Sequence, residues 1–250
     1  MERIRRAADV ARLPIDVPAE RIECVELPLD RERLRNHPVV LPEDPSQAAH
    51  AYRMLRTQLL QKIRYHRLRV VGIASAVDAE GKTVTAVNLA LSLAAEPNQS
   101  VVLADLDLRR PSIASLLGLA PPKGLSDWFS GQADVDEVCC RIEGIARLVI
   151  APTLAPVAGS SEVLAGPRTS QLLNGLEARQ PDCIVLLDMP PVLLSDDFLT
   201  ISPLVDGVLV VATEGYSKRE DLMRMREVLG STRVLGTVLN RASKAERRSY

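Results

Sequence analysis

The sequence has few aromatic residues, no long apolar run and almost no net charge. Aromatic residues make up 3% of its 250 residues, and the formal net charge is −1. No apolar run approaches the roughly 20 residues of a membrane-spanning helix, and the first residues lack the apolar core of a signal peptide. The charge balance gives no general argument for nucleic acid, so no such partner is expected. We expect a soluble, cytoplasmic protein that reaches a membrane only through a partner.

Cysteine is also scarce, and its four copies follow no metal-binding or redox spacing. They are Cys24, Cys139, Cys140 and Cys183. Neither a C-x-x-C pair nor a histidine cluster accompanies them, so we interpret them as reduced and mostly buried thiols. Hydrophobic residues (46%) and charged residues (25%) occur in ordinary amounts. They suffice for one substantial domain with a real core.

Proline separates the start of the chain from the rest. Six prolines interrupt every candidate element in the first 45 residues. They are Pro14, Pro18, Pro28, Pro38, Pro42 and Pro45. We expect a flexible leader without a core at residues 1–45 and a folded domain at residues 46–242. Residues 243–250 would form a short basic tail that ends in Tyr250.

Residues 46–66 have the pattern of an amphipathic helix. Ser46 follows a proline and can cap the helix at its amino end. The apolar side chains form one stripe, which consists of Ala49, Tyr52, Leu55, Leu59 and Ile63. We interpret this stripe first as a core-packing face. Arg53 and Arg56 lie one turn apart and could form ion pairs with acidic groups of another subunit.

A phosphate-binding loop is predicted between an apolar strand at residues 70–73 and a helix that begins at Lys82. The backbone N–H groups of such a loop and the positive end of the helix dipole surround a polyphosphate. Lys82 would reach the β- and γ-phosphates, and the hydroxyl of Thr83 would bind Mg²⁺. In the usual G-x-x-x-x-G-K-[ST] pattern, glycine stands where this chain has Ala76. A Cβ at this position can be costly.

Carboxylates follow two further apolar strands. Asp105 and Asp107 come after the run at residues 101–104, and Asp188 comes after the run at residues 183–187. In an open α/β sheet the carboxyl ends of the strands form the ligand-binding edge. Asp188 would hold Mg²⁺, while Asp105 and Asp107 could organise the metal or accept a proton. Alternatively, Asp105 is an ordinary loop or helix-cap residue.

Apolar strands alternate with helices through the rest of the chain. Further strands are predicted at residues 147–151, 207–213 and 234–240. Asp196 and Asp197 are interpreted as caps of a helix that begins there, because their charge suits the helix dipole. The alternation predicts an α/β fold of the P-loop NTPase type, with a doubly wound, mostly parallel sheet and helices on both faces.

Seven segments occur in an order that is typical of one known family. They are Tyr52-Arg-Met-Leu-Arg-Thr-Gln-Leu, Glu80-Gly-Lys-Thr, Leu103-Ala-Asp-Leu-Asp-Leu-Arg-Arg-Pro, Gly124-Leu-Ser-Asp, Leu187-Asp-Met-Pro-Pro-Val, Asp206-Gly-Val-Leu-Val-Val and Gly236-Thr-Val-Leu-Asn-Arg. Over about residues 46–242 the chain resembles the cytoplasmic domain of bacterial tyrosine kinases (BY-kinases, CpsD/CapB type) of capsule and exopolysaccharide biosynthesis. That family belongs to the MinD/ParA-like P-loop ATPases.

The resemblance implies ATP and Mg²⁺ as cofactors and assigns site residues by position. The residues that would bind the nucleotide are Ala79, Glu80, Gly81, Lys82, Thr83, Val84 and Asn240, the last beside the adenine. The residues that would hold Mg²⁺ are Thr83, Asp105 and Asp188. The catalytic residues would be Lys82, Asp105 and Asp107.

The resemblance also implies partners. Arg53 and Arg56 would belong to the helix that builds a ring-shaped homo-oligomer. The cytoplasmic tail of a transmembrane activator, a polysaccharide copolymerase, would dock on the domain and recruit it to the inner face of the cell membrane. Tyr250 is the candidate for autophosphorylation in trans.

The chain departs from the family at three places. Its loop has Asp78 and Ala79 where the family has Pro-Gly, and His50 stands where the oligomer helix has glutamate. The tail offers Tyr250 alone in place of a tyrosine cluster.

Two functions therefore stay open. The first is an ATP-dependent protein-tyrosine autokinase that regulates polysaccharide synthesis and export, which the intact segment 105–109 (Asp-x-Asp-x-Arg) favours. The alternative is an ATP-binding, catalytically degenerate switch or regulatory subunit of a membrane polysaccharide copolymerase. The altered loop and the missing tyrosine cluster favour this alternative. Of the two functions, we favour the kinase. A partitioning ATPase of the ParA type is more distant, because residues 74–80 lack the additional lysine that those proteins usually carry.

Overall fold

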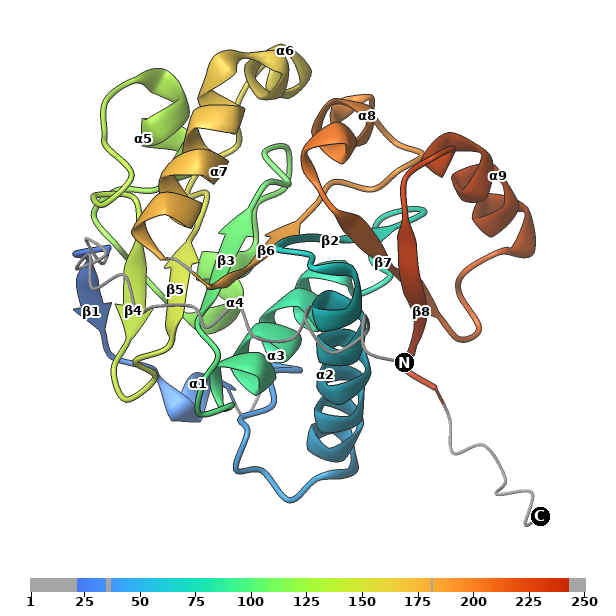
Figure 1. Ribbon diagram of the computed structural model, residues 1–250, viewed down its shortest axis with the longest axis horizontal. Coiled ribbons are helices and arrows are strands. Elements are labelled where there is room, and N and C mark those ends of the chain that lie inside the picture. The colour runs from blue at the N-terminus through green and yellow to red at the C-terminus, as the bar shows by residue number, and fades with distance from the viewer. Residues whose placement is uncertain (1–21, 35–36, 181, 243–250) are drawn as a thin grey trace, which may run out of the picture.

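An eight-stranded sheet runs through the middle of the computed structural model, which describes residues 22–34, 37–180 and 182–242 (Figure 1). The strand order is β1-β4-β5-β3-β6-β2-β7-β8. The strands are β1 (Val25–Leu27), β2 (Val70–Ser75), β3 (Val101–Asp105), β4 (Cys140–Ile142), β5 (Leu148–Ala151), β6 (Ile184–Asp188), β7 (Gly207–Thr213) and β8 (Val234–Asn240). Neighbouring strands pair in parallel, except β4 and β5, which are antiparallel. The predicted mostly parallel sheet is confirmed.

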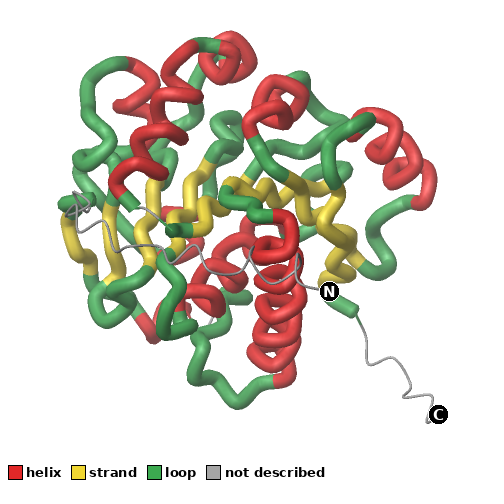
Figure 2. Tube along the Cα trace, viewed as in Figure 1, coloured by secondary structure: helices red, strands yellow, loops and turns green. Residues whose placement is uncertain are grey.

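Helices cover both faces of this sheet, as Figure 2 shows. On one face lie α1 (Arg31–Leu34), α2 (Gln47–His66), α3 (Lys82–Ala94) and α4 (Ile113–Leu117). On the other face lie α5 (Leu125–Ser130), α6 (Ser160–Ala165), α7 (Pro167–Arg179), α8 (Asp197–Ile201) and α9 (Arg219–Leu229), with a 3-10 turn at Ser202–Leu204. None of the helices in the described segments has the length and apolar content needed to cross a membrane.

The central strands are buried along their whole length because helices cover both of their faces. Every residue of β2, β3, β6 and β7 is buried. Successive side chains of a strand point to opposite faces. In β2, Val70 and Ala74 accordingly join one core cluster, while Val71 and Ile73 join the other. The parallel strands end at one common edge, and the candidate site lies there.

The helix predicted at residues 46–66 is confirmed as α2. The Oγ of Ser46 accepts a hydrogen bond from the backbone N–H of Ala49 at 3.2 Å, which caps the helix as predicted. Leu59 and Ile63 of the apolar stripe are buried, and α2 packs against α3. The stripe is therefore a core-packing face.

The structure differs from the predicted leader at residues 22–45. Residues 25–27 form the edge strand β1, which pairs with β4, and the side chain of Ile22 is fully buried. The Oδ1 of Asn88 in α3 accepts the backbone N–H of Val40 at 2.7 Å, and its Nδ2 donates to the carbonyl of Pro38 at 2.9 Å. Proline is excluded from the interior of a helix or a central strand, but it is compatible with a short edge strand and with packed loops. The other leader residues, 1–21 together with 35 and 36, lie outside the described part.

The interpretation of the cysteines as free thiols is confirmed. All four are free; Cys24 is half-buried and the other three are buried. Burial raises the pKa of Cys183 to about 11 and that of Cys140 to about 12.

Candidate functional site

The phosphate loop lies where the sequence places it, between the end of β2 at Ser75 and the start of α3 at Lys82. Gly81 has a φ of 87°, and a Cβ at this position would lie 2.0 Å from Nδ2 of Asn240, so glycine is required there. Ala79 also has a left-handed φ, of 62°. A left-handed residue with a Cβ costs about 1–2 kcal/mol. The costly position is therefore Ala79; Ala76, which was expected to be costly, does not have a positive φ.

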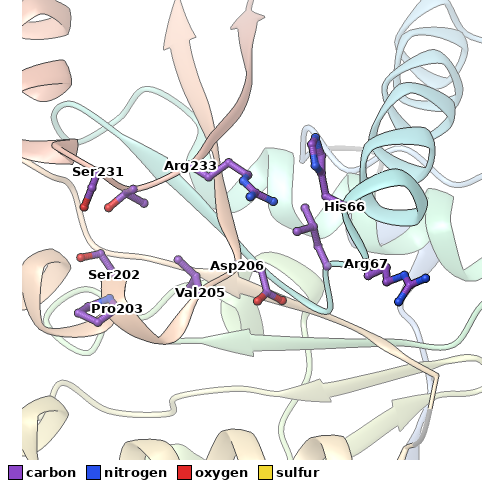
Figure 3. Close-up of a pocket in the computed structure, with 10 residues that line it drawn as sticks. His66, Arg67, Ser202, Pro203, Val205, Asp206, Ser231 and Arg233 are labelled. Carbon is purple, nitrogen blue, oxygen red and sulfur yellow. The ribbon is translucent and has the colours of Figure 1, made fainter.

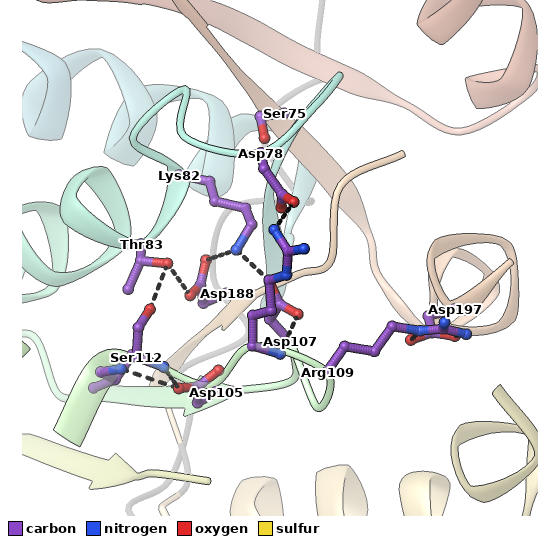
Figure 4. Close-up of polar contacts among 12 residues, drawn as sticks. Ser75, Asp78, Lys82, Thr83, Asp105, Asp107, Arg109, Ser112, Asp188 and Asp197 are labelled. Carbon is purple, nitrogen blue, oxygen red and sulfur yellow. Dashed lines mark hydrogen bonds and ion pairs between the residues drawn. The ribbon is translucent and has the colours of Figure 1, made fainter. Parts of the chain in front are cut away.

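Two buried carboxylates lie near each other beside this loop, at the ends of adjacent strands (Figure 4). Asp105 and Asp188 are register partners at the ends of β3 and β6, and neither is exposed to solvent. The hydroxyl of Thr83 donates to Oδ2 of Asp188 at 2.6 Å. The Oδ2 of Asp105 accepts the backbone N–H groups of Ser112 and Ile113 at 3.0 and 3.1 Å. The structure thus brings together three of the predicted site residues.

The electrostatics of this pair fit a divalent cation. Burial raises the pKa of Asp105 well above its usual range, and the charge of Asp188 adds to this effect. Burial likewise raises the pKa of Asp188, although Lys82 and Thr83 oppose it. The Oδ1 atom of each carboxylate is buried and has no hydrogen-bond partner among the described residues. A cation would neutralise both groups and satisfy these two atoms.

The number of protein ligands fits Mg²⁺ bound together with a nucleotide. The described segments contain no cluster of three or more His, Cys, Asp or Glu side chains suited to a metal. Mg²⁺ usually needs only one or two carboxylates, because phosphate oxygens and waters supply its other ligands. Thr83, Asp105 and Asp188 could hold such an ion.

Lys82 lies between the carboxylates of Asp107 and Asp188. With Thr83 and Asp105, these residues form the carboxylate cluster of the site. The Nζ of Lys82 is 2.5 Å from Oδ2 of Asp107 and 3.9 Å from Oδ1 of Asp188. Burial alone would lower the pKa of Lys82, but the charges of Asp188 and Asp107 outweigh burial and raise this pKa overall. Lys82 therefore stays protonated. An ammonium group has three N–H donors, so it can bind a phosphate oxygen while it keeps the contact with Asp107.

Arg109 and Asp197 form an ion pair that the sequence did not predict. The Nε and Nη2 of Arg109 donate to the two carboxylate oxygens of Asp197 at 2.9 and 3.0 Å. The hydroxyls of Ser160, at 2.7 Å, and of Ser161 also donate to this carboxylate. Burial opposes these contacts, but together they lower the pKa of Asp197. α8 begins where the sequence predicts, with Asp196 at the N-cap position and Asp197 in the first turn, but no side-chain cap hydrogen bond forms there.

A second ion pair that the sequence did not predict links the phosphate loop to the segment after β3. The guanidinium of Arg110 donates to Asp78, which lies in the loop itself. The backbone N–H of Arg110 donates to Oδ1 of Asp107 at 3.2 Å. Both arginines belong to the segment that follows β3, but no spacing rule connects that segment with residues 78 and 197.

The other predicted site residues lie at different distances from this cluster. Asn240, at the end of β8, donates from Nδ2 to the carbonyl of Glu80 at 3.2 Å, so it contacts the loop. Val84 lies in the first turn of α3. Tyr250 lies outside the described residues.

Arg53 and Arg56 lie on α2 and contact their own chain. Arg53 donates from Nη1 to the carbonyl of Pro42 at 3.2 Å. Arg56 donates to the carbonyl of Ser92 at 3.0 Å and forms an ion pair with Glu96 at 2.7 Å. Within the described part of the chain, none of these contacts reaches Asp105, Asp107 or Asp188.

A cavity of about 620 Å³ lies away from this cluster, at the edge of the sheet where β2, β7 and β8 begin (Figure 3). Its polar lining includes His66, Arg67, Asp206 and Arg233. Asp206 caps that edge, since its Oδ2 accepts the backbone N–H of Val70 at 2.9 Å. None of the predicted site residues in the described segments lines this cavity, so the candidate site rests on the cluster of Lys82, Thr83, Asp105 and Asp188.

Comparison with known proteins agrees with this geometry. The ParA family profile, described as NUBPL iron-transfer P-loop NTPase, matches residues 67–245. The succinoglycan biosynthesis transport protein ExoP of Rhizobium meliloti is 28% identical over 218 residues, which cover 85% of this chain and 27% of ExoP. The tyrosine-protein kinase YwqD of Bacillus subtilis is 25% identical over 221 residues, which cover 87% of this chain and 91% of YwqD.

The chain is also similar to a solved structure of a kinase domain. The kinase domain of VpsO is 28% identical and superposes with a TM-score of 0.67, over 77% of this chain and 94% of that domain. The chain spans about a quarter of the length of ExoP, but nearly the whole of YwqD and of the VpsO kinase domain.

Proposed function

We propose, since the chain belongs to the ParA family of P-loop NTPases, that it binds Mg·ATP and transfers the γ-phosphoryl group to tyrosine. The observation that carries this proposal is the cluster of buried Lys82, Asp105 and Asp188 with half-buried Thr83 at one end of the phosphate loop. A polyphosphate would lie on the backbone N–H groups of residues 79–84, at the positive end of the α3 dipole.

The side chains of the cluster have two proposed roles, phosphate binding and Mg²⁺ binding. Lys82 binds phosphate oxygens as a point charge, and its contact with Asp107 keeps it in place. Thr83, Asp105 and Asp188 hold Mg²⁺. When bound, Mg²⁺ neutralises charge that develops on the transferring phosphoryl group and the leaving oxygen.

Asp107 is the proposed proton acceptor. The attacking phenol oxygen forms a bond to the γ-phosphorus while the bond between that phosphorus and the β–γ bridging oxygen breaks, and ADP leaves. The phenolic proton passes to a carboxylate oxygen of Asp107, which has lone pairs beyond its contacts with Lys82 and Arg110. Positioning and charge neutralisation account for most of the rate enhancement in phosphoryl transfer.

The relatives support this assignment and its biological setting. YwqD is named a tyrosine-protein kinase, and the VpsO domain is named a kinase domain. ExoP is named for succinoglycan biosynthesis and transport. We propose that this chain likewise regulates synthesis of a capsule or exopolysaccharide. A homo-oligomer would form, and the cytoplasmic tail of a membrane copolymerase would activate it at the inner face of the membrane.

A second candidate function is an ATP-gated switch without kinase activity. The left-handed Ala79, at a position where related kinases carry glycine, is the observation that favours it. Such a protein would bind Mg·ATP and assemble with the copolymerase but transfer no phosphate.

Intact-mass spectrometry after incubation with Mg·ATP tests both candidates. The protein is incubated with and without a synthetic peptide of a candidate copolymerase tail, alongside Lys82→Met and Tyr250→Phe. A gain of about 80 Da per phosphate that both variants lack would establish a kinase that uses Tyr250. Nucleotide binding without any gain of phosphate, even with the peptide, would favour the switch.

Lys82→Met also tests the site itself. A ligand at a hundred times its Kd stabilises a protein by about 2.7 kcal/mol, which raises the Tm of a domain of this size by about 5–10 °C. We expect Mg·ATP to produce this rise in the native protein and not in Lys82→Met, because the phosphate-directed charge is lost. An equal rise in the variant would remove Lys82 from the site.

A further inference from the structure

The phosphate loop contains a carboxylate that does not belong to the catalytic cluster. Glu80 precedes Gly81 and is fully buried. It forms no ion pair with a basic side chain in the described residues, although a buried carboxylate without compensation is costly. Hydrogen bonds must therefore compensate its charge.

Those hydrogen bonds come from the loop itself and from the turn after β7. The Oε2 of Glu80 accepts the backbone N–H of Val77 at 3.0 Å. Its Oε1 accepts the hydroxyl of Ser217, and the Oγ of Ser217 in turn accepts the backbone N–H of Thr213 at 2.7 Å. One side chain thus closes residues 77–80 into a turn and ties that turn to a neighbouring element.

The backbone of Glu80 is held from the same side. Its carbonyl accepts the hydroxyl of Thr213 at 2.7 Å and the Nδ2 of Asn240 at 3.2 Å. Thr213 ends β7 and Asn240 ends β8. Glu80 is therefore bonded through both its side chain and its carbonyl to the carboxyl ends of two adjacent strands.

This arrangement explains how the loop keeps a strained residue. Ala79, with its left-handed φ, lies inside the turn that the bond between Glu80 and Val77 closes. Strained backbone persists only where its surroundings fix it, and hydrogen bonds to an ionised carboxylate are among the strong ones. Glycine at position 79 would adopt this φ without strain. Alanine needs its surroundings to fix the turn, and the contacts of Glu80 do so.

We infer that Glu80 is a positioning residue that holds the phosphate loop in its nucleotide-binding shape, and that Ser217 is the side chain through which it does so. The inference rests on the proposed nucleotide site, but not on kinase activity. The β7–α9 turn, residues 214–218, thereby becomes a support of the site, although none of its residues was predicted to take part.

Calorimetric titration with Mg·ADP tests this inference on the full chain. Ser217→Ala removes the hydroxyl and should weaken Mg·ADP binding by about tenfold, the usual effect of losing a hydrogen bond to a charged group. Ser217→Thr keeps the hydroxyl and should bind within about threefold of the native protein.

A matched control separates positioning from general loss of stability. Ser160→Ala removes the same kind of bond, from a serine hydroxyl to the buried carboxylate of Asp197. Among the described residues, the side chains that contact this carboxylate are those of Arg109, Ser160 and Ser161, and none of them belongs to the phosphate loop. Both alanine variants should lower the Tm, but only Ser217→Ala should weaken Mg·ADP binding. Unchanged affinity in Ser217→Ala, or equal weakening in both variants, overturns the inference.

A second measurement does not depend on the nucleotide. Amide hydrogen exchange of the peptide that spans residues 75–83 should accelerate in Ser217→Ala without ligand, since the loop loses its anchor. Unchanged exchange there would overturn the positioning role even if the protein bound no nucleotide. A failure of the proposed kinase activity alone would leave both readouts intact.

Discussion

Asp197 is a single carboxylate that joins three separate segments of the chain. It accepts hydrogen bonds from Arg109, which follows β3, and from Ser160 and Ser161 at the start of α6. Its carboxylate is buried, while Arg109 is half exposed. The ion pair therefore links the segment after β3 to α6 and α8 on one face of the sheet.

Asp197→Asn should lower the free energy of unfolding at pH 7 by about 1–2 kcal/mol, because solvent around Arg109 screens part of the interaction. The pKa of Asp197 is lowered in the folded protein. Its stabilising contribution is therefore complete above the unfolded pKa of about 4 and is lost as the pH falls through the folded pKa. Urea denaturation at pH 7 and at about pH 3 measures the difference.

Asp196→Asn provides the control for this prediction. Asp196 is mostly exposed and lies 3.7 Å from Arg109, so its replacement should change stability by less than about 0.5 kcal/mol. Equal losses in the two variants, or a loss in Asp197→Asn that does not shrink at low pH, would contradict the role of Asp197.

The element that changes the predicted domain boundary is β1. Two independent features bind this region to the domain, namely the pairing of β1 with β4 and the burial of Ile22 in the core between the sheet and helices α5 to α9. A strand of three residues among prolines gives no periodic signal, because periodicity needs at least four residues to become visible. Pairing with β4 and packing of Leu27 against the core therefore define β1.

Ile22→Ala should therefore destabilise the protein by about 2–4 kcal/mol, as expected for the truncation of a fully buried side chain. Val25→Ala, on the same segment but 42% exposed, should cost less than about 1 kcal/mol. Equilibrium unfolding in urea compares the two. If residues 22–45 were a detached leader, both substitutions would be neutral.

At the scale of the whole molecule, α2 is the surface on which the proposed oligomer depends. Arg56 is engaged by Ser92 and Glu96 of its own chain, whereas Arg53 is half-buried and contacts the carbonyl of Pro42. Arg53 is therefore the better probe of an intersubunit contact, because Arg56→Ala would also remove contacts within the subunit.

We expect Arg53→Glu to shift the protein toward the monomer, since the reversed charge would repel acidic groups on a neighbouring subunit. Light scattering coupled to gel filtration measures the molar mass. Lys62→Glu makes the same charge change at an exposed position of the same helix and should leave the mass unchanged. A native protein that is monomeric at all concentrations, or an oligomer indifferent to Arg53→Glu, would contradict the proposal.

The amino-acid sequence by itself determined the alternation of strands and helices, the phosphate loop and the carboxylates at the ends of β3 and β6. These features depend on local periodicity and on short motifs, in which the residues that act together lie close in sequence. The mostly parallel sheet follows, because apolar strands separated by helices leave few other topologies.

Only the tertiary structure decided which distant side chains meet. Arg109 donates to Asp197, which lies 88 residues away in the sequence, and Glu80 accepts a hydrogen bond from Ser217, which lies 137 residues away. Such bonds depend on strand order and loop packing, which no local pattern encodes. The same holds for β1, which pairs with β4, and for Ala79, whose left-handed φ lies inside the turn that the bond between Glu80 and Val77 closes.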